Sequence, residues 1–402
     1  MKINVSSCVY NPDKVTYDQP VSISSPLLKE NRSDLNCKDL IAYPPFINSH
    51  DHLISNWYPK ASESQPYKNV NLWVVGMKAT PSFIERNKVW INDGSFDLTL
   101  GTAPLIIKLG VFKNMFSGCA VVQDHIHKQK HEYYQGHPIT ILEDYTQCHS
   151  VSMGNWWGGK TAEEEWFDAH GKMPFVIHLA EGTDDFARTC FPKIARMNLL
   201  QPNTLLIHAI ALNKTDLKRC ADEGTSICWC PESNLFLIGE TLDIYTCMEL
   251  GINVVIGTDS PMSGSISMLS ELQFAHEHFP DIPMNEMFRM ITTNAAKALF
   301  LPEGTATLGK DNQDILLIKK YNNDPFENLL ELNIDDIQFF MHKGIPVCGE
   351  SSFLDHFEIN NEDYYFYDTN SENKFALGRP DKTIAEIDKL LGYHKDFPFI
   401  PF

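Results

Sequence analysis

The sequence predicts an α/β protein whose main part is a (β/α)8 barrel, with a small β-sandwich domain built from the two ends of the chain. Three observations predict this architecture. Short apolar runs alternate with helix-like segments from about residue 45 to residue 300. Several runs end on a polar residue, as barrel strands do where their C-terminal ends meet at one mouth. The segments before and after this alternation are β-like. We therefore expect a barrel at 45–304 and a β domain made of 1–44 and 305–402.

The expected strands are short apolar runs, which is typical of parallel strands buried on both faces. The clearest runs that end on polar residues are 46–52, 175–181, 205–208, 228–234 and 254–259. Expected helices cover 99–117, 161–171, 215–222, 242–250, 268–278 and 382–392. Strands three and four are expected at 139–142 and 151–153, with no recognisable helix between them. No glycine-rich dinucleotide fingerprint follows the first strand, which favours a barrel over an open sheet.

Charge and composition limit the partners of the protein. The 402 residues include 33 basic and 52 acidic side chains, and the net charge of −19 disfavours nucleic acid and anionic membranes as partners. Ten cysteines, several of them inside apolar runs, are typical of reduced core residues. We see no apolar stretch long enough to span a membrane and no signal-peptide pattern at the start. We therefore expect a cytoplasmic protein.

Histidines at strand ends indicate a metal site. His50 and His52 are two residues apart, so on an ideal strand both imidazoles point the same way and can reach one ion. Two other pairs have the same spacing. His125 and His127 are expected in a loop or at the surface, with a place at the mouth of the site as the alternative. His276-x-His278 lies in a helix-like stretch, where residues two apart diverge.

Later strands add four candidate residues. His178 alone could be a hydrogen-bonded core histidine, but Glu181 follows it at the strand end. A glutamate beside a metal-activated water can move protons between that water and a leaving group. His208 could be another ligand or a base bonded to the water. Asp259 could orient the water, or it could only cap the next helix.

These pieces together resemble the amidohydrolase superfamily of metal-dependent TIM-type barrel hydrolases, in particular its cytosine/guanine deaminase and chlorohydrolase-like branch. The matching pieces are Pro45–His52, His178–Glu181, His208, Cys230–Asn234 and Gly257–Ser260, with Thr292–Leu299 and Gly309–Lys310 at the exit of the barrel. The resemblance covers roughly residues 40–320.

The resemblance implies one divalent metal per chain, held by His50, His52, His178 and Asp259, with His208 as a further candidate ligand. Zinc is the first choice, and iron and manganese suit the same ligands. Glu181, His208 and Asp259 are then the catalytic residues. Binuclear members add a strand-four lysine, which Lys160 and Lys172 do not match.

The sequence departs from the family pattern at Pro44-Pro45, in the compressed region of strands three and four, and at the start of strand seven, Cys228-Trp229-Cys230. Cys228–Asn234 contains no ligand, so we interpret it as pocket wall. Within it the bulky Trp229 is expected near the site or in the barrel wall.

The leading function is hydrolytic deamination of an amino-substituted N-heterocycle of the purine, pterin or pyrimidine type. The alternatives are hydrolysis of a cyclic amide or of a halogenated ring, and a non-catalytic barrel scaffold. A small heterocyclic substrate and a homodimer are the expected partners.

Overall fold

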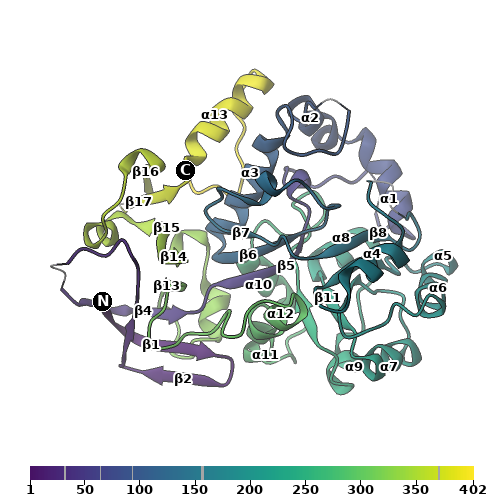
Figure 1. Ribbon diagram of the computed structural model, residues 1–402, viewed down its shortest axis with the longest axis horizontal. Coiled ribbons are helices and arrows are strands. Elements are labelled where there is room, and N and C mark those ends of the chain that lie inside the picture. Colours follow the sequence, from purple (N-terminus) through teal and green to yellow (C-terminus); the bar gives the residue numbers. More distant parts are fainter. Residues whose placement is uncertain (31–32, 64, 93, 155–157, 370–371) are drawn as a thin grey trace.

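The computed structural model describes residues 1–30, 33–63, 65–92, 94–154, 158–369 and 372–402 (Figure 1). Its centre contains eight parallel strands in two hydrogen-bonded sheets, ordered β5-β6-β7 and β12-β11-β10-β9-β8. These strands are β5 Phe46–Asp51, β6 Cys119–Asp124, β7 Thr140–Ile141, β8 Thr146–Ser150, β9 Phe175–Leu179, β10 Thr204–His208, β11 Ser226–Trp229 and β12 Val254–Ile256. The parallel strands and mixed α/β content that the sequence predicts are therefore present.

Helices connect most of the parallel strands. The α-helices of the described residues are α1 Val70–Gly76, α2 Pro81–Val89, α3 Ala103–Phe116, α4 Ala162–Ala169, α5 Asp185–Arg188, α6 Cys190–Arg196, α7 Lys214–Glu223, α8 Pro231–Ile238, α9 Ile244–Glu249, α10 Met268–His278, α11 Met284–Met290, α12 Thr293–Ala298 and α13 Pro380–Leu391, the last four of which follow β12. Short 3-10 helices include η1 Leu53–Ser55, which directly follows β5. All six helices expected from the sequence are found, with small differences at their ends. No helix within the described ranges has the length and apolar character needed to cross a bilayer.

The fourth strand lies earlier than the sequence suggested. We expected it at 151–153, but those residues form a turn, and β8 is Thr146–Ser150. The apolar-run criterion missed β8 because its buried residues include the polar Gln147 and His149. Only residues 142–145 separate β7 from β8, and they contain no helix. This is why no helix could be recognised there.

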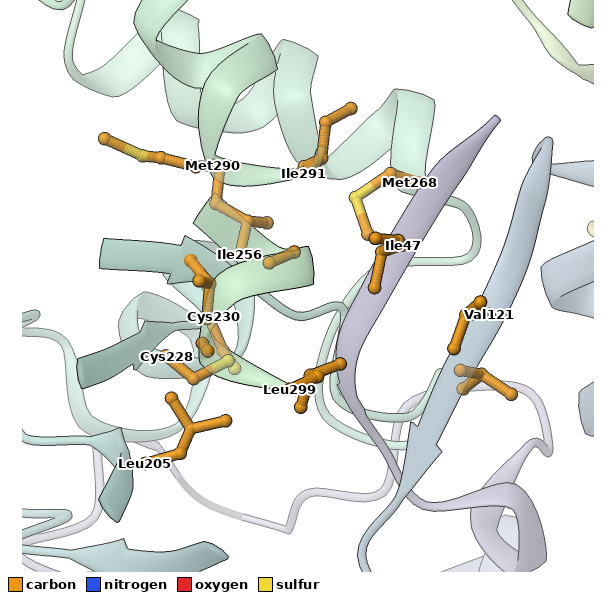
Figure 2. Packing of buried hydrophobic residues seen from close by; sticks show 14 of the residues in the cluster. Ile47, Val121, Leu205, Cys228, Cys230, Ile256, Met268, Met290, Ile291 and Leu299 are labelled. Atoms are coloured by element: carbon orange, nitrogen blue, oxygen red, sulfur yellow. The ribbon is translucent and has the colours of Figure 1, made fainter. Parts of the chain in front are cut away.

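The first and last parallel strands lie side by side. The backbone N–H of Asp259, just after β12, donates to the carbonyl of His50 on β5 at 3.1 Å. Gly257 permits this approach, because a Cβ atom there would lie 2.6 Å from Cβ of His50. Figure 2 shows Ile47 of β5 and Ile256 of β12 in the same core cluster, which also contains Met268 of α10.

The two ends of the chain form one sheet of nine strands, ordered β16-β17-β15-β14-β13-β4-β1-β2 with β3 also paired to β1. The strands are β1 Lys2–Asn11, β2 Lys14–Tyr17, β3 Pro20–Ser22, β4 Leu35–Tyr43, β13 Ile315–Lys319, β14 Ile337–His342, β15 Ile345–Glu350, β16 Tyr364–Thr369 and β17 Glu372–Leu377. Antiparallel pairing of β4 with β13 joins the N-terminal and C-terminal segments. A second apolar core, separate from that of the parallel strands, lies against this sheet.

Gly257 provides a test of the contact between β12 and β5. We expect Gly257→Ala to lower the free energy of unfolding by about 1–3 kcal/mol, because the added methyl group must push the two strands apart. Gly309→Ala is the matched control, since a Cβ atom there meets nothing within 4 Å. Urea denaturation of both variants measures the difference. Equal stability of the two variants would show that β12 and β5 are not in close contact.

Candidate active site

Six imidazoles converge at the C-terminal ends of the parallel strands. His50 and His125 have no accessible surface, and even the most accessible of the six, His52, is only 9% exposed. The shortest distance between two ring centroids is 4.1 Å, from His125 to His178. The complete set is His50 and His52 on or after β5, His125 after β6, His149 on β8, His178 on β9 and His208 on β10.

Ligand atoms of these residues form three groups in which all atoms lie within 4.8 Å of one another. The groups are His50, His52 and Asp259; His50, His178 and His208; and His125, His149 and His178. The structure therefore brings together every metal-ligand candidate named from the sequence. The expected set of His50, His52, His178 and Asp259 is divided between two groups that share His50.

Hydrogen bonds fix the tautomers of two histidines. Nδ1 of His178 lies 2.6 Å from the carbonyl oxygen of His149, which can only accept, so Nδ1 carries the proton and Nε2 has a free lone pair. Nε2 of His178 lies 3.2 Å from Nε2 of His50. Nδ1 of His208 donates in the same way to Oδ1 of Asn234 at 2.7 Å. Each ring thus presents Nε2 for a metal or a water.

The backbone at the strand ends is strained where it orients these side chains. His208 and Asp259 adopt positive φ angles of 68° and 51°, and Ala180, beside Glu181, has a φ of 54°. Such angles are uncommon for residues other than glycine and are often found at functional sites. Here they occur at the ends of β9, β10 and β12.

Burial keeps most of these imidazoles neutral. It lowers the pKa of His50, His125, His149 and His178 well below 6.5, and the neighbouring histidines lower it further. The pKa of His52 is also lowered by burial, although Asp259 and Asp51 oppose the shift. A neutral imidazole has the lone pair that a metal needs, so these rings are ready to act as ligands near neutral pH.

The two carboxylates differ in acidity. Burial raises the pKa of Glu181 to about 7, and Asp259 adds to this shift while His208 opposes it. For Asp259, burial also favours the neutral acid, but His52 and His208 outweigh it, so its pKa falls below the usual value. The Ser233 and Ser263 hydroxyls assist by donating to Oδ2 of Asp259 at 2.8 and 2.9 Å. Glu181 can therefore hold a proton where Asp259 is ionised.

A buried ion pair fixes the strands on which the ligands lie. Nζ of Lys113, on α3, is 2.9 Å from Oδ2 of Asp51, and both side chains are fully inaccessible. The same ammonium group donates to the Thr258 hydroxyl at 2.9 Å and to the Asp259 carbonyl at 3.2 Å. Asn48 of β5 donates to the Thr258 hydroxyl at 2.8 Å. This network joins β5 to the end of β12.

A cavity opens onto the histidine cluster. It encloses about 610 Å³ of atom-free space, which includes open solvent at its mouth. Its lining combines site residues with an apolar wall that includes Val70, Trp73, Met77, Phe83 and Met262. Such a wall suits a flat, partly apolar molecule.

Three site features differ from the sequence interpretation. His125 was expected in a loop or at the surface, with a place at the mouth of the site as the alternative, and the structure places it in the buried cluster, while its neighbour His127 remains half-buried. His149 was not recognised at all. A histidine on a strand or directly after it was the sequence signal available for His125 and His149. For His149 the polar sequence of β8 hid this signal.

The Cys228–Asn234 stretch does not line the cavity and instead lies behind the site. Asn234 and Ser233 bond to His208 and Asp259. Trp229 is part of the barrel wall, because its ring packs 5.1 Å from Phe279 and its Nε1–H donates to Thr241 at 2.8 Å. The interpretation of this stretch as pocket wall was therefore wrong.

Residues 158–347 match the amidohydrolase family. A 5-methylthioadenosine/S-adenosylhomocysteine deaminase of Pyrococcus horikoshii is 33% identical over 144 residues, which cover 32% of this chain and 34% of that protein. The guanine deaminase of Rattus norvegicus is 27% identical over 142 residues, covering 32% of this chain and 31% of that protein. These alignments therefore span about a third of each curated relative.

Solved structures are similar over nearly the whole chain. The zinc complex of an atrazine chlorohydrolase from Arthrobacter aurescens aligns with a TM-score of 0.69 at 15% identity, covering 97% of this chain and 99% of that chain. An adenosine deaminase from Xanthomonas campestris with bound zinc aligns with a TM-score of 0.63 at 16% identity, covering 86% and 92%. At these identities the similarity shows a shared fold.

The contacts of Lys113 predict that a substitution of this lysine strongly lowers the stability of the protein. We expect Lys113→Met to lower the free energy of unfolding by about 3–5 kcal/mol, because it leaves the buried Asp51 carboxylate without its counter-charge. Lys108→Met, at an exposed position of the same helix, should change it by less than about 0.5 kcal/mol. Urea denaturation of metal-free protein measures both. Similar losses in the two variants would contradict a special role of Lys113.

Proposed function

We propose that this chain, which matches the amidohydrolase family over residues 158–347, is a metal-dependent hydrolase that removes the amino group of an N-heterocycle of the purine, pterin or pyrimidine type. The observation that carries the proposal is a cluster of neutral imidazoles beside one ionised and one protonatable carboxylate, at the end of a cavity with an apolar wall. Deaminases among its relatives support this reaction class.

We propose one divalent metal at this site, held by His50, His52, His178 and Asp259, with His208 as a further candidate ligand. The residues fit such an ion, because the rings are buried, neutral and turned toward one another. Zinc is the first choice because two similar folds bind it, and iron or manganese suit the same ligands. When bound, the ion lowers the pKa of a water and orients it for attack.

Glu181 is the proposed proton carrier. With a pKa of about 7, it can hold a proton near neutral pH and release it to a ring nitrogen of the substrate. Its Oε2 lies 3.7 Å from Nε2 of His208, so a proton can pass between these two side chains over a short distance. Protonation of the ring nitrogen makes the amino-bearing carbon a better acceptor for water.

Asp259 and His208 are the proposed acceptors of the proton from the water. Asp259 accepts hydroxyl bonds at Oδ2, while its Oδ1 accepts from the backbone N–H of Ser260 at 2.8 Å and lies 3.8 Å from Nε2 of His52. His208 is held by Asn234, so its unprotonated Nε2 can accept from the same water. Once the proton has passed to the amino group, ammonia can leave.

We also propose the finer architecture. The contact between β12 and β5 supports closure of the eight strands into a (β/α)8 barrel, which requires β7 to lie next to β8. The nine-stranded sheet is proposed to curve over the second apolar core as a β-sandwich. The domain limits at 44/45 and 304/305 are part of this proposal. A crystal structure would test the closure of the barrel, because it would show whether β7 lies next to β8.

Partners and compartment follow from the same reasoning. We propose a heterocyclic small-molecule substrate, a homodimer, no binding to nucleic acid or membranes, and a cytoplasmic location. The net charge of −19 supports the exclusion of nucleic acid. Light scattering after size-exclusion chromatography tests the dimer, and a monomer would contradict it.

Ammonia release tests the proposed reaction. Zinc-loaded protein is incubated with aminopurines, pterins and cytosine, and we expect ammonia from at least one class. Chlorinated triazines and cyclic amides are the comparison, assayed for chloride and for ring-opened product. Chloride or ring opening without ammonia would favour the alternative hydrolases. A metal content near zero, or turnover that His178→Ala leaves unaltered, would favour a non-catalytic scaffold.

Glu181→Gln separates proton transfer from metal binding. We expect this variant to keep its metal content and to lose about 10²–10⁴-fold in kcat, because a neutral amide cannot supply the proton. Glu163→Gln, at an exposed position of α4, is the matched control and should retain full activity. Elemental analysis and steady-state kinetics provide the two readouts. Loss of metal in Glu181→Gln would make Glu181 a ligand and remove the proton-transfer role.

A further inference from the structure

Arg86 is a buried cation that lines the active-site cavity and has no part in the proposed proton transfers. It lies on α2, in the segment between β5 and α3, and is only 3% exposed. The same cavity is lined by Glu181, His208 and Asp259. Burying a charge is costly unless an opposite charge or hydrogen bonds compensate it. The partners of Arg86 therefore indicate what this part of the cavity can bind.

The hydrogen-bond acceptors of the Arg86 guanidinium are all neutral. Nη1 donates to the carbonyl oxygen of Ile54 at 3.0 Å and to the hydroxyl of Ser55 at 3.4 Å. Nε and Nη2 donate to one oxygen, Oδ1 of Asn87, at 3.1 and 2.7 Å. A guanidinium has five N–H groups, so these four bonds leave one N–H of Nη2 with no acceptor among the residues that the structure describes. The bonds hold the group in place but bring no negative charge to it.

No carboxylate in the described part of the chain forms an ion pair with Arg86. Burial alone lowers its pKa, to about 10, and no acidic neighbour offsets this shift. The adjacent Glu85 is engaged elsewhere, because its Oε2 accepts from Nε1 of Trp57 at 2.7 Å and lies 2.7 Å from Nζ of Lys395. A group with a pKa of about 10 is still charged at neutral pH. The cavity therefore has a positive charge that the described residues do not neutralise.

Two aromatic rings fix the position of the guanidinium. The ring centroids of Phe83 and Trp90 lie 4.8 and 4.9 Å from Cζ of Arg86. Cation–π contacts of this kind stabilise a cation without neutralising it. Phe83 also lines the cavity, so the guanidinium and an apolar surface are presented together. A guanidinium that is already held in place loses little freedom when it binds an anion, which favours binding.

We propose that Arg86 determines substrate specificity by binding an oxyanion, a carboxylate or a phosphate, that the heterocyclic substrate carries. This inference rests on the proposed function, because it names the substrate class of the same site. The bonds from Arg86 to Ile54 and Ser55 place the guanidinium beside η1, which begins directly after His52. The oxyanion therefore binds on the side of the cavity that η1 and α2 form.

Matched ligand pairs test the proposal. Each pair is an amino-substituted heterocycle with and without an oxyanion: pterin-6-carboxylate and pterin, 5-carboxycytosine and cytosine, and adenosine 5′-monophosphate and adenosine. Binding to the zinc-loaded Glu181→Gln protein, which should not turn these ligands over, is measured by isothermal titration calorimetry. We expect the anionic member of at least one pair to bind about tenfold more tightly or better, because only that member forms charge-assisted bonds with Arg86. The pairs also distinguish a carboxylate from a phosphate.

Arg86→Met, made in the same zinc-loaded Glu181→Gln protein, removes the charge and keeps a long side chain. We expect this variant to lose the preference for the anionic member, while its affinity for the neutral member changes by less than about threefold. Arg196→Met is the matched control, because it removes the same charge at an exposed position of α6, and it should keep the preference. Arg86→Lys keeps the charge without the planar fork, so we expect an intermediate preference. Circular dichroism shows whether the variants are folded.

The outcomes separate this inference from the proposed function. Equal affinity for both members of every pair, or an unchanged preference in Arg86→Met, overturns the anionic substrate class and leaves deamination intact. An equal loss of affinity for both members in Arg86→Met shows that Arg86 binds the ring itself, which also overturns the inference. Selective binding of anionic members from which the wild type releases no ammonia contradicts deamination and leaves the oxyanion site intact. If Arg86→Met does not fold, Arg86→Lys decides, and an unchanged preference in that variant overturns the inference.

Discussion

The ion pair between Lys113 and Asp51 is the constraint on which the site depends. It joins β5 to the end of β12, which are the first and last of the parallel strands and the strands nearest to His50, His52 and Asp259. Burying two charges costs several kcal/mol per ion unless hydrogen bonds satisfy the remaining donors and acceptors. Here the ammonium group has three oxygen contacts, and Asp51 also accepts from Asn56 and Asn114. The pair therefore resists small displacements. His50 and His52 flank Asp51, and the Asp259 carbonyl accepts from Lys113. The ion pair, rather than a metal, therefore sets the distances between these three residues.

Much of the site could be predicted because local sequence signals coincide with structural positions. A polar residue at the end of a short apolar run marks a strand end, and this criterion located His178, His208 and Asp259 on three separate strands. Helix limits were predicted for the same reason, as the capping box of Thr161 and Glu164 shows. Such signals can be recognised from a few residues that are close together in the sequence.

The rest depends on contacts that are distant in the sequence. His149 lies in a strand whose buried residues include Gln147, so no apolar run marks it. Lys113 looks like an ordinary helix residue until α3 places it against β5 and β12, 62 residues from Asp51 and 145 from Thr258 in sequence. His125 was misjudged because a histidine pair after a strand is equally compatible with a surface loop. Only tertiary structure distinguishes these cases.

The opposite pKa shifts of Glu181 and Asp259 show how one buried cluster can contain two carboxylates with different tasks. Both are desolvated to a similar degree, so burial alone would make both neutral. The difference comes first from His52 and His208, which outweigh burial and lower the pKa of Asp259. Two serine hydroxyls that donate to Asp259 add to this effect, whereas no such donors are among the causes of the Glu181 shift. These neighbours together select which carboxylate is ionised. A site with one ionised and one protonated carboxyl can bind a cation and still supply a proton, which is the combination that hydrolytic deamination requires.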